Sequence, residues 1–353
     1  SAQPSRDHEL RACWYRLSEK NPGELEQTIR RLSEVGFNCF CPETIYWGGA
    51  IYPGAHELLG QHPEFSGWDP LRELVRLCHQ YNMKLVPWVE VYFIGFKESP
   101  LVHNRAEWLA MARNGSHPSS LEEGYYFFCP SREEVRTFWL EVYEHLLRNY
   151  EIDGLQLDYI RYPRSIPWTE GFCYCPVCRE KFFNLHDEDA ATINPSDNPE
   201  LWREWNRLRM SQVTEFVRRV RHLTISLRPD IPLSADVFPD LAEARDSKFQ
   251  DWPGWAAEGY LDELYFMAYT TDAEWLRRDI RKVEELLPDR FPSWVGLGPY
   301  LGLSPELLLD QIRVVRESGS QGVCLFALEH LTDEHLRALR LGPFRRPALI
   351  PAP

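Results

Sequence analysis

Short apolar runs alternate along this chain with longer segments whose apolar positions recur every three to four residues. The short runs are typical of buried β-strands, and the longer segments are typical of helices with one buried face. Eight such runs occur, at residues 11–16, 37–43, 84–93, 154–160, 231–238, 261–269, 292–300 and 322–328. Strand then helix, eight times, predicts a (β/α)8 TIM barrel. The rival is a doubly wound open sheet, but no Gly-rich dinucleotide-binding loop follows the first run.

Several of the predicted helices have a recognisable first turn. A capping residue stands directly before proline three times, at Asn21-Pro22, Asp69-Pro70 and Ser304-Pro305. Ser131 and Glu134 have the spacing of a capping box. Thr332 precedes two acidic residues, which favour the positive end of a helix.

The spacing of the strands predicts where long loops are inserted into the barrel. Successive strand starts are separated by 47, 70 and 77 residues after the second, third and fourth strands, whereas the last four starts lie about 30 residues apart. The excess forms three long loops on the face of the barrel that carries active sites. We predict one barrel domain over residues 10–342, a loop insertion with a Cys cluster at 163–201, and a Pro-rich tail at 343–353.

Composition removes several classes of protein. With 39 basic and 53 acidic residues the net charge is −14, so nucleic acid is not expected as a partner. No apolar stretch approaches the roughly 18 residues of a membrane helix, so no membrane partner is expected. The absence of Walker and dinucleotide motifs predicts no organic cofactor, and the absence of a Gly-x-Ser-x-Gly elbow argues against a serine nucleophile. Oligomeric state is left open.

The strand at residues 154–160 carries the first candidate for chemistry. Side chains alternate across a strand, so Gln156 and Asp158 are expected to face the barrel axis, with Asp158 at the upper end. Buried acids are costly unless they are used or paired. The alternative role for Asp158 is an ion pair with Arg161. We favour catalysis or substrate contact, because acids at the tops of barrel strands are usually functional.

The same alternation on other strands predicts a pocket of acids and aromatic rings. Glu90 and Asp236 are expected beside Asp158, and for each of them a structural ion pair with Arg16 or Arg161 is the alternative. The residues expected to contact substrate are Trp14, Arg16, Trp88, Tyr92, Arg161, Tyr265, Tyr269 and Glu329, the last with its strand phase left open.

Aromatic residues make up 13% of the chain, and several are expected near these acids. Paired carboxylates in an aromatic cleft are what glycoside hydrolysis requires: one protonates the leaving oxygen, and the other attacks or activates water. Sugar faces stack on Trp and Tyr rings. Aromatics of the long loops are expected to extend this surface: Tyr46, Trp47, Tyr52, Trp68, Tyr125, Tyr126 and Trp168.

Three cysteines stand close together at Cys173, Cys175 and Cys178. Three thiolates at this spacing can share one tetrahedral ion, which predicts a structural zinc site, with free or disulfide-bonded thiols as the alternative. Cys129, in the neighbouring long loop, is the preferred fourth ligand and Cys41 the second choice. The 11 histidines show no spacing of a catalytic zinc site.

The chain resembles the glycosyl-hydrolase-like family 10 proteins over about residues 10–340. The resemblance runs through RACWYR, GFNCF, WDPLRELVRLCHQYNMKLVPWVEVY, CPSREEVRTFW, YEIDGLQLDYIRYP, DELYFMAYT and GVCLF. It implies a TIM barrel, bacterial carbohydrate hydrolysis, and in some members a secreted or periplasmic enzyme acting on peptidoglycan glycan strands. Asp158, Arg161 and Tyr269 fall on the family pattern, whereas Glu90 stands where a residue such as Asn is more usual. The reduced Cys cluster is also compatible with the cytoplasm.

The cysteine pattern has a resemblance of its own. Cys129 with Cys173-x-Cys175-x-x-Cys178 is similar to the structural four-Cys zinc cluster of family 42 beta-galactosidases. We therefore predict a glycoside hydrolase that cleaves a poly- or oligosaccharide with paired carboxylates, Asp158 with Asp236 or Glu90. The alternatives are a carbohydrate-binding barrel without catalysis and a barrel hydrolase that uses a loop metal for its chemistry.

Overall fold

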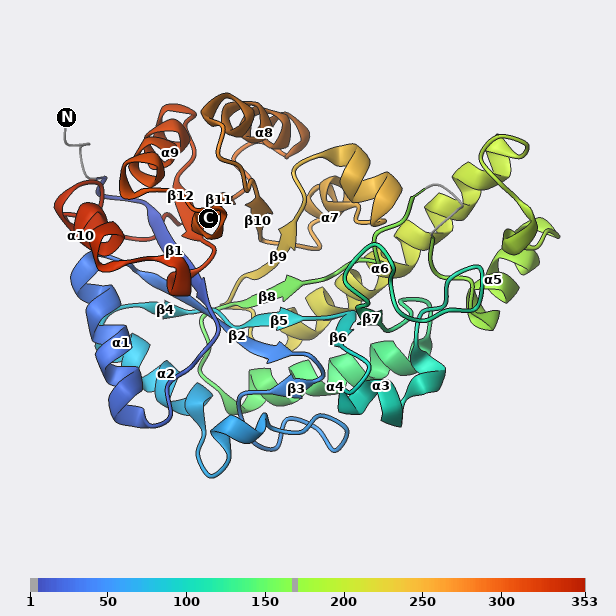
Figure 1. The fold of residues 1–353 in the computed structure, drawn as a ribbon, viewed down its shortest axis with the longest axis horizontal. Coiled ribbons are helices and arrows are strands. Elements are labelled where there is room, and N and C mark those ends of the chain that lie inside the picture. Colours follow the sequence, from blue (N-terminus) through green and yellow to red (C-terminus); the bar gives the residue numbers. More distant parts are fainter. Residues whose placement is uncertain (1–5, 167–170, 353) are drawn as a thin grey trace.

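The computed structural model describes residues 6–166 and 171–352, and it contains the predicted barrel. Hydrogen bonds join eight strand positions in a ring in the order β1, β12, β11, β10, β9, β8, β5 and β2, and a further pairing of β1 with β2 closes it. All pairings within the ring are parallel, so the chain is a (β/α)8 TIM barrel (Figure 1). The ring strands are β1 (Leu10–Tyr15), β2 (Cys39–Tyr46), β5 (Trp88–Glu90), β8 (Leu155–Asp158), β9 (Leu233–Val237), β10 (Glu263–Met267), β11 (Ser293–Leu297) and β12 (Gly322–Leu325).

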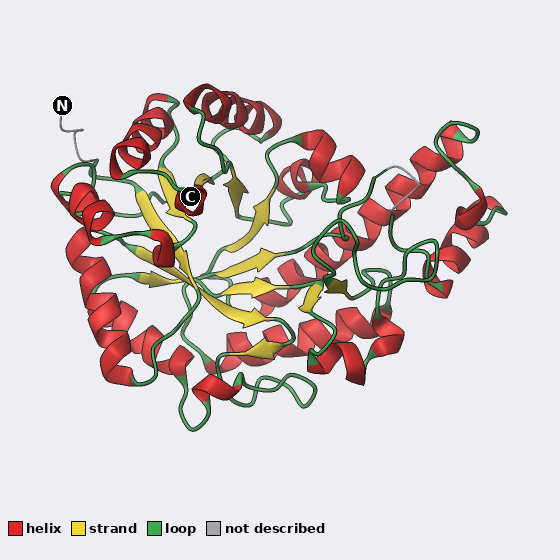
Figure 2. Cartoon of the chain, in the orientation of Figure 1, coloured by secondary structure: helices red, strands yellow, loops and turns green. Residues whose placement is uncertain are grey.

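Helices surround this ring (Figure 2). The α-helices are α1 (Pro22–Val35), α2 (Pro70–Gln80), α3 (Pro100–Asn104), α4 (Glu133–Asn149), α5 (Pro176–His186), α6 (Pro199–Leu227), α7 (Trp252–Ala257), α8 (Ala273–Leu286), α9 (Pro305–Glu317) and α10 (Asp333–Leu341). The remaining strands are short: β3 (Gly49–Ala50), β4 (Lys84–Leu85), β6 (Phe93–Gly95) and β7 (Tyr126–Phe127). No helix within 6–166 or 171–352 is both long and apolar enough to span a membrane.

The helix caps show how local chemistry sets these boundaries. The side chains of Asn21, Asp69 and Ser304 each accept a hydrogen bond from a backbone N–H in the first turn of α1, α2 and α9, which confirms the three predicted starts. The capping box predicted at Ser131 is wrong, because α4 begins at Glu133 without a side-chain cap. The Ser131 hydroxyl lies 3.4 Å from the Tyr162 hydroxyl instead, where two long loops meet.

Three long loops follow β2, β5 and β8 at the carboxyl end of the barrel. The loop after β2 forms β3, the loop after β5 forms β6, α3 and β7, and the loop after β8 forms α5. In Figure 1 the α5 segment and the adjoining end of α6 extend beyond the barrel. The insertion therefore projects beside the face where the strands end.

The opposite end of the barrel is covered by the C-terminal tail. Leu349 pairs with the residues before β1, through hydrogen bonds to Asp7 and Glu9 of 2.9 Å each. Buried Arg11 donates to the carbonyl of Arg346 at 2.7 Å. Ile350 packs against the apolar interior of the barrel. The Pro-rich tail is thus docked, and it closes the end of the barrel away from the long loops.

Candidate active site

A cavity of about 400 Å³ opens at the carboxyl ends of the barrel strands. Its wall combines charged groups with aromatic rings. The charged residues are Arg16, Glu43, Glu90, Asp158, Arg161, Asp236 and Glu329, and the aromatic ones are Trp14, Trp47, Trp88, Phe93, Tyr125, Tyr159, Phe238, Tyr269 and Phe326. Nine of the eleven catalytic and substrate-contacting residues expected from the sequence are brought together here.

Three carboxyl groups stand on three successive strands. Glu90 of β5 is the register partner of Asp158 of β8. Asp158 and Asp236 directly follow the Leu157–Ala235 pair of β8 and β9. Because neighbouring strands lie about 4.8 Å apart, the backbone positions of the three acids are adjacent. The barrel thus gathers three acids on one rim of the cavity.

Asp158 is held by two hydrogen bonds from opposite sides of its carboxylate. Oδ2 accepts from the Trp88 indole N–H at 2.8 Å, and Oδ1 accepts from the Tyr159 backbone N–H at 2.7 Å. Burial raises the pKa of Asp158 to about 6, while these two donors and Arg161 act in the opposite direction. Asp158 therefore changes its charge near neutral pH in a fixed orientation.

Glu90 and Asp236 are more deeply buried than Asp158. Burial raises the pKa of both carboxyls well above the usual range; Glu43 and Asp158 add to the effect at Glu90, and Asp158 adds to it at Asp236. Among residues 6–166 and 171–352, Glu90 Oε1 and Asp236 Oδ1 are buried oxygens without a hydrogen-bond partner. Buried polar atoms normally have one, so these two oxygens are unusual within the wall of the cavity.

The two arginines that were expected to pair with the three cavity acids form ion pairs with other carboxylates. Arg161 pairs with Glu122, a residue of the loop after β5, at 2.8 Å. Arg16 pairs with Glu43 at 2.7 Å. Neither arginine is joined to Asp158 in an ion pair, so the structural alternative for Asp158 lacks its proposed partner within the described residues.

Among the charged residues of the cavity wall, Glu43 was not identified by the sequence analysis. Cys39, Cys41 and Glu43 alternate along β2, and the two cysteines lie in the barrel interior. Alternation therefore also directs Glu43 inward, at the upper end of the strand. The signal was present, and the same reasoning that identified Asp158 would have identified Glu43.

Two expected substrate contacts lie outside the cavity wall. Tyr92 is fully buried and packs against Phe216 of α6, with ring centroids 5.8 Å apart. Alternation holds only within a regular strand, and β5 ends at Glu90, so the inward orientation predicted for Tyr92 is wrong. Tyr265 fills the barrel interior, 6.0 Å from the ring of Trp14, without lining the cavity.

Some aromatic residues of the long loops line the cavity, and others pack in or against the core. Trp47 and Tyr125 line the cavity. Tyr52 is buried in the core, and Trp68 packs against that core. Trp168 lies outside the described residues.

The four predicted metal ligands form one buried cluster. Their sulfur atoms all lie within 4.8 Å of one another. The Cys129 sulfur is 3.4 Å from that of Cys178 and 3.7 Å from that of Cys175. A disulfide requires about 2.05 Å, and all four thiols are free. Cys41, the second choice for the fourth ligand, lies in the barrel interior instead.

This arrangement fits a tetrahedral ion. Zn–S bonds of about 2.3 Å place tetrahedral sulfur atoms about 3.8 Å apart, close to the separations seen here. Hydrogen bonds from the other cluster thiols lower the pKa of Cys175, which therefore favours a thiolate. The fully buried guanidinium of Arg209 donates to the carbonyl of Phe172, next to Cys173, and supplies a positive charge nearby. Four cysteines would fill all four positions of a tetrahedral zinc ion, as in structural zinc sites.

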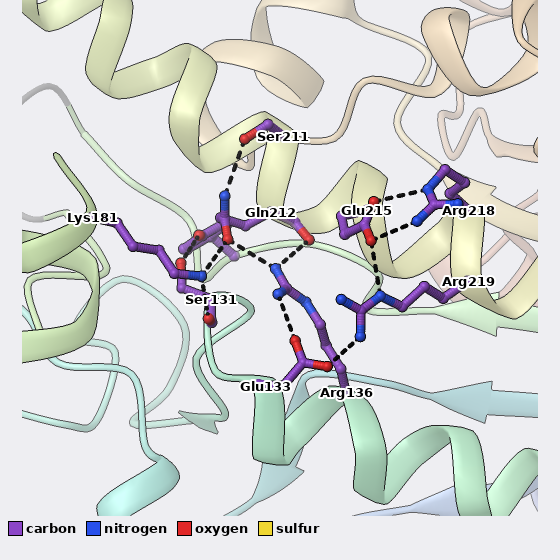
Figure 3. A network of polar contacts seen from close by, with 10 residues as sticks. Ser131, Glu133, Arg136, Lys181, Ser211, Gln212, Glu215, Arg218 and Arg219 are labelled. Carbon is purple, nitrogen blue, oxygen red and sulfur yellow. Dashed lines mark hydrogen bonds and ion pairs between the residues drawn. The ribbon is translucent and has the colours of Figure 1, made fainter. Parts of the chain in front are cut away.

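A polar network braces the helices around this cluster (Figure 3). Lys181 of α5 donates to the Ser131 carbonyl at 2.6 Å and to the Gln212 side chain of α6 at 2.9 Å. Arg136 of α4 donates to the same Gln212 oxygen at 2.8 Å and pairs with Glu133. The network joins α4, α5 and α6, so the cluster loop is attached to the barrel wall from several sides.

A (β/α)8 barrel with several carboxyls and aromatic rings at its carboxyl end is the architecture of a glycoside hydrolase. Residues 9–296 match the Glycosyl hydrolase-like 10 family, and the chain belongs to that family.

Individual relatives agree with this assignment. The chain is 21% identical over 416 residues to "Glycosyl hydrolase YngK" of Bacillus subtilis (strain 168), with 99% of this chain and 74% of that protein covered. The PgaB (BpsB) glycoside hydrolase domain from Bordetella bronchiseptica shares the fold with a TM-score of 0.75, at 15% identity over 95% of this chain and 99% of that one. Gan42B, a GH42 beta-galactosidase from G. stearothermophilus, has a TM-score of 0.66 at 13% identity, over 97% and 57% of the two chains.

Proposed function

We propose that this protein is a glycoside hydrolase that cleaves O-glycosidic bonds of a poly- or oligosaccharide by paired carboxylates. The observation that carries the proposal is the row of Glu90, Asp158 and Asp236 on adjacent strands, facing a cavity lined by aromatic rings. Membership of a glycosyl hydrolase-like family supports it. A bacterial cell-wall glycan is the substrate class we favour.

In this reaction the chain supplies one proton donor and one ionised carboxylate. Asp158 suits the ionised role, because the two N–H groups that it accepts from stabilise its negative charge. Glu90 and Asp236 suit the proton-donor role, since burial favours their neutral form. Trp14 and Tyr269 offer ring surface for the sugar.

The zinc proposed for the four-Cys cluster has a structural role. When bound, it would cross-link the loop after β5, through Cys129, to the loop after β8, through the other three cysteines. Both loops contribute to the cavity wall, through Tyr125 and Arg161.

The test is product release from a panel of polysaccharides and peptide-free peptidoglycan strands, with Asp158→Asn as the variant. We expect turnover by the wild type and a loss of at least about a thousandfold in the variant, because an essential acid–base group is removed. The matched control is Asp153→Asn at the other end of the same strand segment, where the carboxylate accepts from the Leu85 backbone N–H. This control should keep its activity.

Three results would count against the proposal. Full activity in Asp158→Asn would remove that residue from the mechanism. Glycan binding by the wild type with no product from any substrate would favour a carbohydrate-binding barrel. A chelator that abolishes turnover of a chain that stays folded would favour chemistry at the metal, contrary to a structural zinc.

A further inference from the structure

Glu43 lies between a cation and a second acid at the rim of the cavity. The guanidinium of Arg16 donates to both oxygens of Glu43, from Nε at 2.7 Å and from Nη2 at 3.0 Å. The same guanidinium lies 4.7 Å from the ring centroid of Tyr46 and 4.1 Å from that of Trp47. This two-point contact, placed against two rings, pairs Glu43 with a cation in a fixed geometry.

Glu43 is also a neighbour of Glu90. The two residues stand on the paired strands β2 and β5, where Glu43 is the register partner of Trp88. Both are buried, at 2% and 3% exposed, and both line the cavity. Two neighbouring buried carboxyls disfavour each other's ionised form, so one of the pair retains its proton. Because Arg16 neutralises Glu43, that proton belongs to Glu90.

We propose that Glu90 is the proton donor of the hydrolysis and that Glu43, held by Arg16, is the positioning residue that keeps Glu90 neutral. The assignment rests on the proposed function and names which acid works with Asp158. Glu90 lines the cavity that it shares with Asp158.

The step balances with groups on the chain and one water. The O–H bond of Glu90 breaks as an O–H bond forms on the glycosidic oxygen. The bond from that oxygen to the anomeric carbon breaks, and its electron pair stays on the leaving oxygen. The anomeric carbon receives an electron pair from Asp158, or from a water that passes its proton to Asp158. In the first case a water then attacks the anomeric carbon, its proton returns to Glu90, and the bond to Asp158 breaks with its electron pair on the carboxylate.

The surroundings of Glu90 are consistent with a retained proton. The ionisable groups around it are Glu43 on β2, Asp158 on β8, Arg16 after β1, and the phenols of Tyr46, Tyr125 and Tyr159. Burial, Glu43 and Asp158 raise the pKa of Glu90, and Arg16 opposes them. The phenols stay neutral, so Glu43, Asp158 and Arg16 set the charge state. At Asp236 burial raises the pKa first, and Asp158 is the acid that adds to the effect.

The test is a titration of the side-chain carboxyls by ¹³C NMR in the full chain, with the Glu90 signal assigned by its absence in Glu90→Gln. We expect Glu90 to be protonated at pH 6. Glu43→Gln removes a negative neighbour and should move the midpoint down by about one pH unit or more, whereas Arg16→Gln should move it up. Glu43→Asp keeps the carboxyl group, so the titration midpoint of Glu90 in this variant should stay close to the wild-type value.

The matched control is Glu9→Gln, which removes a buried, arginine-paired carboxylate at the closed end of the barrel. It should leave the Glu90 midpoint unchanged. A Glu90 that titrates near pH 4.3, like an ordinary glutamate, or that ignores Glu43→Gln, would overturn the proposal.

The pH–rate profile separates this inference from the proposed function. If the wild type hydrolyses glycans, the basic limb should follow the NMR midpoint in each variant. Retained turnover in Glu90→Gln with loss in Asp236→Asn would assign the proton to Asp236 and overturn our choice. If no glycan is cleaved while the midpoints move as expected, the proton assignment stands and the hydrolase proposal fails.

Discussion

At the scale of single residues, Trp88 has two roles: its ring lines the cavity, and its indole N–H binds the carboxylate of Asp158. Its indole N–H donates to Asp158 Oδ2 at 2.8 Å while its ring lines the cavity. One side chain thus offers a surface for a sugar and stabilises the ionised form of a carboxylate that burial disfavours.

We therefore predict that Trp88→Phe keeps the ring but raises the pKa of Asp158 above its value of about 6. The acid limb of the pH–rate profile should move to higher pH by about half a unit to one unit, since one hydrogen bond to the charged form is lost. The measurement is kcat/KM from pH 4 to 8. Trp139→Phe is the control, because the Trp139 indole N–H has no hydrogen-bond partner. An unmoved acid limb in Trp88→Phe would contradict this role.

Sequence reasoning reached part of this site for a simple reason. Alternation within regular strands was enough to direct Asp158 and Asp236 to the cavity, and it would have been enough for Glu43. It failed at Tyr92, beyond the last residue of β5, where backbone geometry is no longer that of a strand. The pairing of Arg161 with Glu122 was out of reach, because the two residues come from different long loops.

At the scale of elements, the Cys cluster and α5 support each other. Cys175 is the N-cap of α5 and Cys178 lies in its first turn. The positive end of a helix favours thiolates, so the helix start and the proposed ion stabilise the same charge. The spacing of these cysteines could be recognised in the sequence. The contact with Cys129, in contrast, depends on how two long loops fold.

We predict that Cys175→Ser lowers the zinc content from about one ion per chain to a small fraction, because a structural site needs all four ligands. The melting temperature should fall by several degrees, and residues 163–201 should become more sensitive to protease. Elemental analysis, thermal melts and limited proteolysis check this. Cys78→Ser removes a buried thiol outside the cluster and should leave the zinc content unchanged. Equal zinc in the two variants would contradict the prediction.

At the scale of the whole molecule, the barrel was the easiest feature to predict. Eight apolar runs that alternate with helical segments pointed to one architecture, and all eight strands are present. The docking of the tail at 343–353 was not foreseen, because Arg11 and Asn38 bind its carbonyl groups and carbonyls carry no sequence signal.

Buried acids also give the molecule a characteristic response to pH. Burial raises the pKa of Asp158 to about 6 and of Glu263 to about 7, and those of Glu90 and Asp236 rise as well. The folded chain then binds more protons than the unfolded chain between about pH 4 and 7, so stability falls as pH rises through this window.

We predict that the free energy of unfolding is lower at pH 8 than at pH 5 by several kcal/mol, with most of the change between pH 5 and 7.5. Ion-paired carboxylates act oppositely: hydrogen bonds from Arg218 and Arg219 lower the pKa of Glu215 to about 2, so its contribution is lost only in strong acid. Urea unfolding at four pH values measures the trend. Asp158→Asn should flatten it, and a curve that rises from pH 5 to 8 would contradict it.

The pairing of Leu349 with the residues before β1 has a practical consequence for engineering. Leu349 is hydrogen-bonded to Asp7 and Glu9, at the end of the barrel opposite the cavity. Asp7 and Leu349 therefore lie away from the cavity, and segments attached beside them would not obstruct it. A short linker between Asp7 and Leu349 would also permit circular permutants that open the chain at an exposed loop while preserving the ring of strands.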